Sequence, residues 1–174
     1  MRIIPYNTML TTTGYNAIMK LESILKPEAV DAFYRRKTVF TEEIKILNNI
    51  VDALEELDDL PVKTALFEIA CVRSVKLLLN SGYTFRNLRL FLYGNVLKPF
   101  RKKLSSALEK LENKEKELEA TIRKVKNFRD HQIVHLDPRF AFEGEKNEGI
   151  SLKDIKEILE YLQESVRVIF EAEY

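Results

Sequence analysis

The sequence predicts an all-α protein, and three observations lead to this prediction. The 174 residues include only five glycines and five prolines, and these breakers divide the chain into a few long segments. Within the segments, apolar residues recur at intervals of three and four, as on one face of a helix. No segment alternates polar and apolar residues over the length of a strand. We therefore expect an antiparallel helical bundle forming a single domain, residues 1–174.

The first half of the chain is expected to hold two amphipathic helices after an N-terminal helical segment, residues 1–40, that matches nothing recognisable. In residues 41–59, Thr41 is a candidate N-cap. The apolar stripe of this helix is Ile44, Leu47, Val51, Leu54 and Leu57. The helix in residues 61–82 should open with Pro61 in its first turn, stop near Gly82 and occupy a central position. Its predicted inward residues are Val62, Leu66, Ile69 and Val72.

The second half should contain a short helix in residues 84–95, a long periodic segment from Pro99 to about His135, and a last helix. The stripe of the long segment is Phe100, Leu104, Leu108, Leu111, Leu118, Ile122 and Val125. It lapses at ENKEKE, residues 112–117, which is either a solvated helix overhanging the bundle or a turn. Ser151 and Asp154 form a near capping box for the last helix. Its stripe is Leu152, Ile155, Leu159, Leu162, Val166 and Ile169.

The overall charge is balanced, with 28 Lys and Arg against 27 Asp and Glu, so binding to nucleic acid requires a local basic patch. The single cysteine, Cys71, lies in an apolar pattern, which favours a buried thiol in a reduced intracellular protein. The N-terminus lacks the unbroken apolar core of a signal peptide, and no run approaches the roughly 18 apolar residues of a membrane span. We expect a soluble cytoplasmic protein without a membrane partner.

The chemistry concentrates in KNFRDHQIVHLDPRF, residues 126–140, which contains both histidines of the chain. Extending the stripe beyond Val125 by the same spacing reaches Arg129, where an apolar residue is expected. An unpaired charge in a core costs several kcal/mol. Arg129 must therefore meet a carboxylate, a subunit interface or a ligand cleft. Asp130 is not expected as the partner, because adjacent side chains on a helix diverge.

The two histidines are expected near the end of the long helix. His131 and His135 are four residues apart and share a face, whereas Arg129 and His135 are separated by roughly 120° around an ideal helix. Arg129 and His135 can address one site only near a helix end or across a concave surface. Asp137 and Pro138 supply that end.

Arg129, Asp130, four residues and His135 together resemble the signature of the HEPN superfamily, and the following HLDP looks most like its abortive-infection branch. In that family the motif lies late in a helix of an all-α bundle, with a further helix after it, as predicted for this chain. A related toxin branch carries a tyrosine two residues after the histidine. Here that position is Asp137, so inhibition by nucleotidyl transfer to that tyrosine is not expected.

The resemblance implies a homodimer in which two motifs meet in a cleft, and a metal-independent endoribonuclease that needs no cofactor. Such proteins are often toxins or phage-defence effectors, with an antitoxin or another protein as partner. His135 would be the general acid or base, Arg129 would bind the scissile phosphate, and Asp130 would orient one of them. The residues expected to contact RNA are His131, Lys126, Lys124 and Arg123.

Other interpretations stay open. The chain could be a catalytically silent HEPN-like module that binds nucleotide, RNA or protein, or a plain helical interaction protein in which Arg129 and His135 have structural roles. A zinc site would need a third ligand, for which only Asp130 and Asp137 are at hand. Further basic clusters lie at residues 35–37 and 101–103, and such clusters are usually solvated faces. The aromatic residues that could either stack on bases or belong to the core are Tyr83, Phe85, Phe91 and Tyr93.

Overall fold

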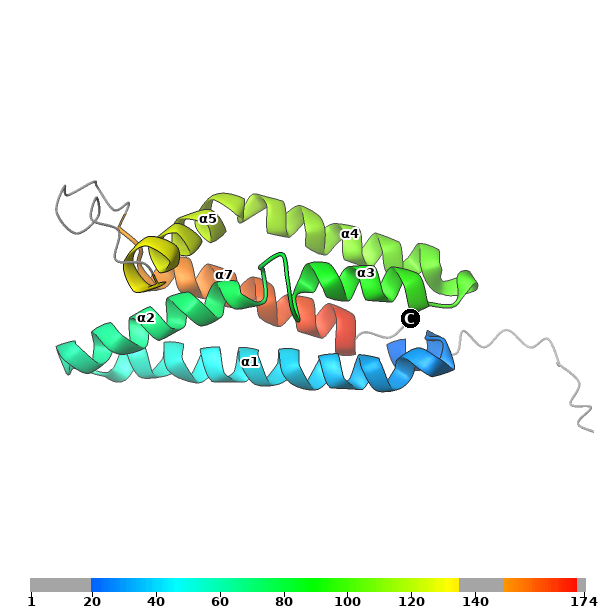
Figure 1. Cartoon of the computed structure of the whole chain (residues 1–174), viewed down its shortest axis with the longest axis horizontal. Helices are drawn as coiled ribbons and strands as arrows, with labels where there is room; N and C mark the ends of the chain where they lie inside the picture. Colours follow the sequence, from blue (N-terminus) through cyan, green and yellow to red (C-terminus); the bar gives the residue numbers. More distant parts are fainter. Residues whose placement is uncertain (1–19, 135–148, 172–174) are drawn as a thin grey trace, which may run out of the picture.

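The computed structural model describes residues 20–134 and 149–171, and this part of the chain is helical with no strand. The all-α class is therefore confirmed. The α-helices are α1 (Val30–Glu56), α2 (Leu60–Lys76), α3 (Phe85–Asn95), α4 (Arg101–Glu117), α5 (Glu119–Phe128) and α7 (Leu152–Val166). All of them except α5 run roughly along the long axis of the molecule (Figure 1). Shorter turns are η1 (Leu21–Ile24), η2 (Pro27–Ala29), η3 (Lys98–Phe100) and the π-helical η4 (Arg129–Val134) and η5 (Arg167–Glu171).

Helix α1 begins earlier than the sequence predicted. Its first residue is Val30, directly after η2, so Thr41 lies inside the helix and caps nothing. The prediction of Thr41 as an N-cap is wrong, because residues 30–40 already have helical backbone and leave no orphan N–H groups at that point. The predicted stripe of α1 is confirmed for its buried members Ile44, Leu47, Val51 and Leu54. Leu57 lies just after the helix and is half-buried.

Helix α2 is capped by Asp59, whose Oδ1 accepts a hydrogen bond from the backbone N–H of Val62 at 3.0 Å. Pro61 lies in the first turn, as predicted. The helix ends at Lys76, before Gly82, which has φ of +84° in the turn that follows. A positive φ of this kind favours glycine, so Gly82 shapes the link to α3 rather than the end of α2.

The predicted inward face of α2 is wrong except at Leu66, which is half-buried and packs against the core. Val62 and Ile69 are 48% and 44% exposed, and Val72 is half-buried in the lining of a surface hollow. The residues that point inward are instead Ala70, Cys71, Ser74 and Val75. Small side chains allow two helices to approach closely, and α2 packs against α1, α5 and α7.

The segment that begins at Pro99 follows one helical path with a bend as far as Val134, where the described residues pause. Helix α4 ends at Glu117 and α5 begins at Glu119, with the bend at Leu118 (Figure 1). Residues 112–117 stay helical and four of the six are exposed, so the stretch is solvated, as predicted. It does not overhang the bundle, because it contacts α3 and α7 through polar side chains. The Oε2 atom of Glu115 accepts hydrogen bonds from Arg89 Nη1 at 2.7 Å and from the Tyr161 hydroxyl at 2.8 Å. Lys114 is paired with Glu164.

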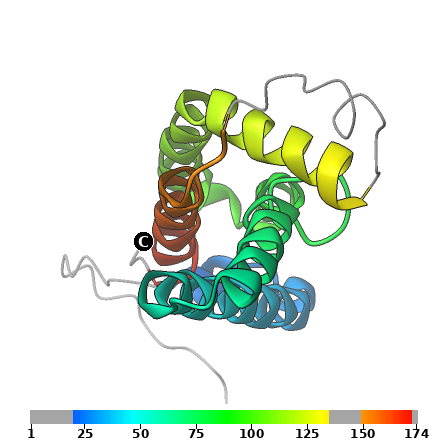
Figure 2. The ribbon, with the colours of Figure 1, turned by 90° about the vertical axis from the view of Figure 1, so that its left-hand side faces the viewer.

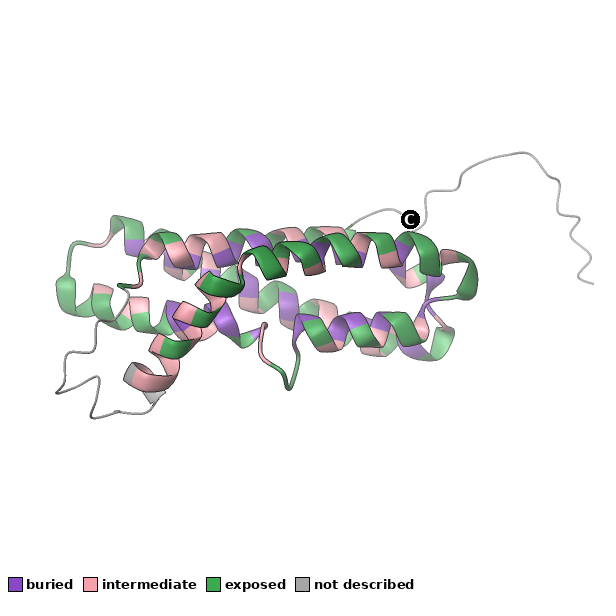
Figure 3. Ribbon diagram, turned by 90° about the horizontal axis from the view of Figure 1, so that it is seen from above, coloured by how far each residue is buried: buried purple, intermediate pink, exposed green. Residues whose placement is uncertain are grey.

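Helix α7 lies at the centre of the bundle, in contact with α1, α2, α4 and α5. Its predicted capping box is confirmed: the Asp154 N–H donates to Ser151 Oγ, and Ser151 N–H donates to Asp154 Oδ2. In Figure 3 buried positions alternate with exposed ones along the long helices, as expected for helices packed on one side. Within residues 20–134 and 149–171, no helix is both long and apolar enough to cross a bilayer.

Candidate functional site

The predicted motif begins in η4, the π-helical turn that continues α5. Figure 2 shows α5 and η4 crossing the end of the bundle toward α2. Two apolar contacts fix this crossing: the Phe128 and Phe67 rings meet with centroids 6.4 Å apart, and Ile133 packs against the core cluster. Short π-helical turns inside helices are frequent at functional sites. These contacts hold in place the turn that carries Arg129, Asp130 and His131.

Arg129 is largely buried, with its side chain 13% exposed, and its charge is met by Asp130. The Nε atom donates to Asp130 Oδ1 at 2.8 Å, and Nη2 donates to the same oxygen at 2.5 Å. The expectation that these neighbours would diverge is wrong. It assumed α-helical geometry, and the wider π turn brings successive side chains closer in angle. Of the three environments predicted for Arg129, the carboxylate is the one observed.

Lys124 has a different role from the other predicted RNA contacts. Its Nζ donates to both carboxylate oxygens of Asp154 at 3.1 Å, which joins α5 to the capping box of α7. Arg123 is exposed, and Lys126 and His131 are half-buried. His135 and Asp137 lie outside the described residues. The structure therefore places Arg129 with Asp130, and Lys124 with the start of α7.

The contact with Lys124 contributes to a change in the pKa of Asp154. Partial burial raises the pKa of Asp154, but the backbone and hydroxyl hydrogen bonds from Ser151 and the Lys124 ammonium lower it more. The net pKa of Asp154 is below its ordinary value. The Asp154 carboxyl group is therefore ionised near neutral pH, where it accepts from Lys124.

Cys71 is not a nucleophile of this site. It is fully buried, and burial, followed by the negative charges of Glu68 and Asp154, raises its pKa to about 12. A thiol in this environment is inert near neutral pH. The prediction of a buried structural thiol is confirmed.

The four aromatic candidates differ in their surroundings. Phe85 is buried, and its ring packs on Phe40 with centroids 4.6 Å apart, so it belongs to the core. The Phe91 ring carries the Arg36 guanidinium at 4.1 Å from its centroid. Tyr83 and Tyr93 are exposed. The Arg36 guanidinium also lies over the Tyr83 ring, 5.8 Å from its centroid, so Tyr93 is the candidate whose ring is exposed without that contact.

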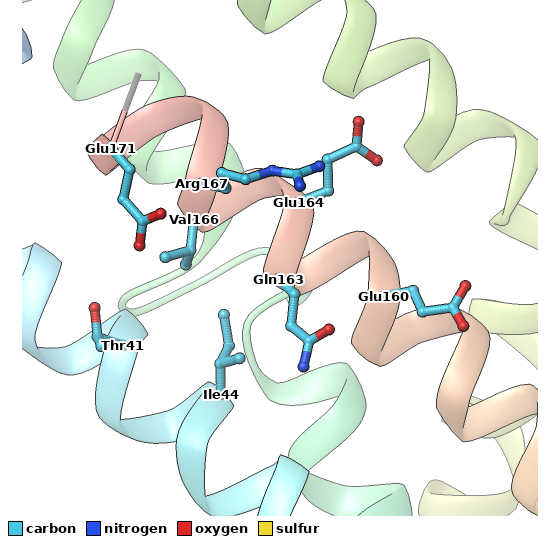
Figure 4. A pocket seen from close by; sticks show the side chains of 8 residues that line it. All are labelled: Thr41, Ile44, Glu160, Gln163, Glu164, Val166, Arg167 and Glu171. Carbon is cyan, nitrogen blue, oxygen red and sulfur yellow. The ribbon is translucent and has the colours of Figure 1, made fainter. Parts of the chain in front are cut away.

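Two of the hollows on the described surface contain no residue from the motif. Figure 4 shows the first, of about 500 Å³, between α1 and the α7–η5 segment. The second, of about 780 Å³, lies beside α4 and includes part of the predicted cluster at residues 101–103. Its lining combines apolar residues with four lysines, which are Lys102, Lys103, Lys110 and Lys114.

A third hollow, of about 380 Å³, adjoins the motif-bearing turn. Its lining residues are Glu68, Ile69, Val72, Arg73 and Lys76 of α2 and Ile133 of η4. Sequence reasoning missed this groove because it placed Ile69 and Val72 in the core. The signal that could have found it is the second apolar face of α2, at Ala70, Cys71 and Val75.

The described ranges hold no cluster of three or more His, Cys, Asp or Glu side chains arranged for a metal ion. Comparison with protein-family models gave no match, and comparison with curated proteins and with solved structures gave none either.

Proposed function

We propose that the chain is a HEPN-type, metal-independent endoribonuclease with an antiparallel HEPN-like bundle. It acts as a homodimer with a composite Arg/His site, in the role of a toxin or phage-defence effector. The observation that carries the proposal is the largely buried Arg129, held by Asp130 in a π-helical turn ahead of His135 in the sequence. A guanidinium that binds phosphate oxygens and a histidine that transfers a proton are two groups with which a phosphodiester can be cleaved without a metal ion.

The contact with Asp130 supports a definite role for each donor of Arg129. Asp130 accepts from Nε and Nη2, and among the described residues Nη1 donates to none. In the proposal, Asp130 orients the guanidinium and Nη1 binds a nonbridging oxygen of the scissile phosphate. Arg129 then stabilises the charge that develops on that phosphate in the transition state.

His135 is assigned the proton transfer. An imidazole exchanges a proton near neutral pH, so His135 can take the proton of the ribose 2′-hydroxyl or give one to the leaving oxygen. Attack of that 2′-oxygen on phosphorus breaks the bond to the 5′-oxygen of the next nucleotide without a metal ion. His131 is assigned to the substrate side of the same site.

The basic residues of α5 are assigned to the RNA backbone. Arg123 is exposed and Lys126 half-buried, so both can approach phosphates, and their contribution should weaken with salt. Lys124 is bonded to Asp154. It therefore supports the site by fixing α5 on α7 rather than by binding substrate.

A catalytically silent HEPN-like module is the second candidate. The observation in its favour is the same ion pair, because Asp130 already compensates the charge of Arg129 and a purely structural role needs nothing more. Such a module would bind nucleotide, RNA or a protein partner such as an antitoxin without turnover.

The deciding experiment is a cleavage assay of the purified full chain on mixed cellular RNA in the presence of EDTA. The parent protein should cleave, and His135→Ala and Arg129→Ala should each lose activity by roughly a hundredfold or more. Arg86→Ala, which removes an exposed arginine from α3, is the matched control and should cleave like the parent. Circular dichroism should show the same helix content for all four proteins.

The outcomes separate the two candidates. Cleavage that persists in both site variants would refute the assigned roles of Arg129 and His135. A parent protein that binds RNA but does not cleave it would establish the silent module, and Arg129→Ala should then weaken that binding.

A further inference from the structure

The groove beside α4 combines an aliphatic floor with a basic rim. Its volume of about 780 Å³ lies in the range of sites that bind small molecules. Ala107 and Leu111 of α4 and Val168 of η5 supply aliphatic surface. Lysine stems are also apolar, so lysines can line a groove with methylene groups and keep their ammonium groups at its solvent edge. The lysines of this groove are Lys102, Lys103, Lys110 and Lys114.

The lysines follow the length of α4. Lys103, Lys110 and Lys114 recur at intervals of seven and four residues, so they lie on one face of the helix. At the rise of an α-helix, this row covers roughly 17 Å. Like charges four residues apart destabilise a helix, and so do cations in a first turn such as that of α4, which holds no acidic residue. Features that oppose local stability are expected at functional sites.

The charges of the groove are unevenly compensated. Its one carboxylate among the described residues, that of Glu164, is paired with Lys114. This pair makes the end of the groove farther from Pro99 neutral. Lys102 and Lys110 are exposed and form no ion pair within residues 20–134 and 149–171. The excess positive charge therefore extends from the first turn of α4 to its middle, and it favours an anionic ligand.

The aliphatic floor indicates which kind of anion fits. Proteins that bind single-stranded nucleic acid add aromatic side chains or arginines, on which the bases stack, to their phosphate contacts. The described residues that line this groove include no aromatic residue and no arginine. Aliphatic surface beside ammonium groups is complementary to an alkyl chain with a negative end, because the chain leaves water and the charges attract.

We propose that this groove binds a free fatty acid, a single alkyl chain that ends in a carboxylate. The carboxylate lies at the first turn of α4, where Lys102 has no counter-ion and the helix dipole is positive. The chain lies along Ala107 and Leu111 toward the pair of Lys114 and Glu164. No residue of the proposed ribonuclease site lines the groove, so this proposal goes beyond the proposed function and does not depend on it.

The first test is isothermal titration calorimetry of the full chain with laurate, below the concentration at which laurate forms micelles. One laurate should bind per chain. Acetate has the carboxylate without the chain, and dodecylamine has the chain with a positive end. Each should bind at least roughly a hundredfold more weakly than laurate. Absence of laurate binding, or equal binding of dodecylamine, would overturn the proposal.

The second test places the ligand in the groove. Lys102→Glu should raise the dissociation constant of laurate by roughly tenfold or more, because a repelling charge replaces an attracting one. Lys116→Glu is the same change at an exposed position of α4 outside the groove. It is the matched control and should bind laurate like the parent at physiological salt, which screens distant charges. Equal dissociation constants for the two variants would overturn the assigned site.

A variant of the floor tests the position of the chain. Ala107→Glu puts a carboxylate on the aliphatic surface and should also raise the dissociation constant of laurate by roughly tenfold or more. Circular dichroism should show that all three variants keep the helix content of the parent. Unchanged affinity in a folded Ala107→Glu variant would overturn the assigned path of the chain.

Two competition experiments distinguish a free fatty acid from other anions. Vesicles of phosphatidylglycerol should not sediment the protein, and a single-stranded RNA oligonucleotide should not displace laurate. Sedimentation with the vesicles that is lost in Lys102→Glu would assign the groove to a membrane surface and overturn the proposal. Displacement by RNA would assign it to a nucleic-acid backbone, with the same consequence. None of these experiments measures RNA cleavage, so the ribonuclease proposal and this one can fail separately.

Discussion

The thiol of Cys71 gives the clearest prediction for a single residue. At pH 8 only about one such thiol in ten thousand is ionised when the pKa is about 12, and the side chain has no contact with solvent. We therefore expect a thiol reagent such as DTNB to modify the native protein only as fast as α2 opens, and to react within seconds in denaturant. Cys71 is the only cysteine of the chain, so the signal needs no further assignment. Rapid labelling of the native protein would contradict its burial.

Arg129 shows what could and could not be predicted at the level of one residue. Its spacing from Val125 predicted that the charged side chain of Arg129 points toward the core. The side chain is 13% exposed, so this prediction is confirmed. The partner was predicted wrongly, since the angle between adjacent side chains depends on local helical geometry. The residue types of η4 do not predict a π-helical turn, so the approach of Asp130 to Arg129 could not be predicted from the sequence.

At the scale of the elements, the carboxylate at the start of α7 should make the free energy of unfolding depend on pH in the acid range. Asp154 has a pKa below its ordinary value in the folded chain. Its ionised form therefore stabilises the fold fully above the unfolded pKa, and this contribution is lost as pH falls through the folded value. We expect Asp154→Asn to reduce the free energy of unfolding at pH 7 and to flatten the acid limb of its pH dependence, measured by urea unfolding between pH 7 and pH 2.

The matched control separates the cap from the charge. Ser151→Ala removes the hydroxyl that accepts from the Asp154 N–H and donates to its carboxylate, and should cost about 1 kcal/mol at pH 7. It keeps the carboxylate, the Ser151 N–H bond and the Lys124 contact, so the acid dependence should be reduced less than in Asp154→Asn. An acid limb unchanged in Asp154→Asn would show that other carboxylates govern it.

Helix α2 shows why the fold class was predictable and the orientation of this element was not. Apolar residues at Val62, Ile69 and Val72 and at Ala70, Cys71 and Val75 give the helix two apolar faces. Periodicity identifies a helix in either case, but it carries no information on which face meets α1 and α7. Helix α7 has one apolar face and a recognisable cap, and both were predicted correctly.

At the scale of the whole molecule, α3, α4 and α7 are joined by a polar network as well as by apolar packing. Arg89 is buried, and its partners are Glu115 at 2.7 Å and, more loosely, Glu112 at 3.7 Å. Burial raises the pKa of Tyr161, and the neighbouring Glu115 carboxylate raises it further. Tyr161 thus stays a neutral donor to Glu115. This network explains how residues 112–117 pack without an apolar side chain.

The network predicts an unequal effect of its two carboxylates. Glu115→Ala leaves the buried guanidinium of Arg89 without its close partner and should lower the free energy of unfolding by about 3 kcal/mol. Glu112→Ala, at a half-exposed position 3.7 Å from Arg89, is the matched control and should cost less than about 1 kcal/mol. Urea unfolding followed by circular dichroism measures both.

A combined variant tests whether the loss of stability comes from the unpaired charge of Arg89 rather than from lost packing. Arg89→Met and Glu115→Leu together remove both charges and keep a similar volume, so the double variant should recover most of the stability lost in Glu115→Ala. A triple variant that adds Tyr161→Phe should be measured beside it, because the Tyr161 hydroxyl has no acceptor once Glu115 is replaced. If Glu115→Ala costs no more than Glu112→Ala, the three helices are held by apolar packing alone. If the double variant is no more stable than Glu115→Ala, the guanidinium is not the source of the loss.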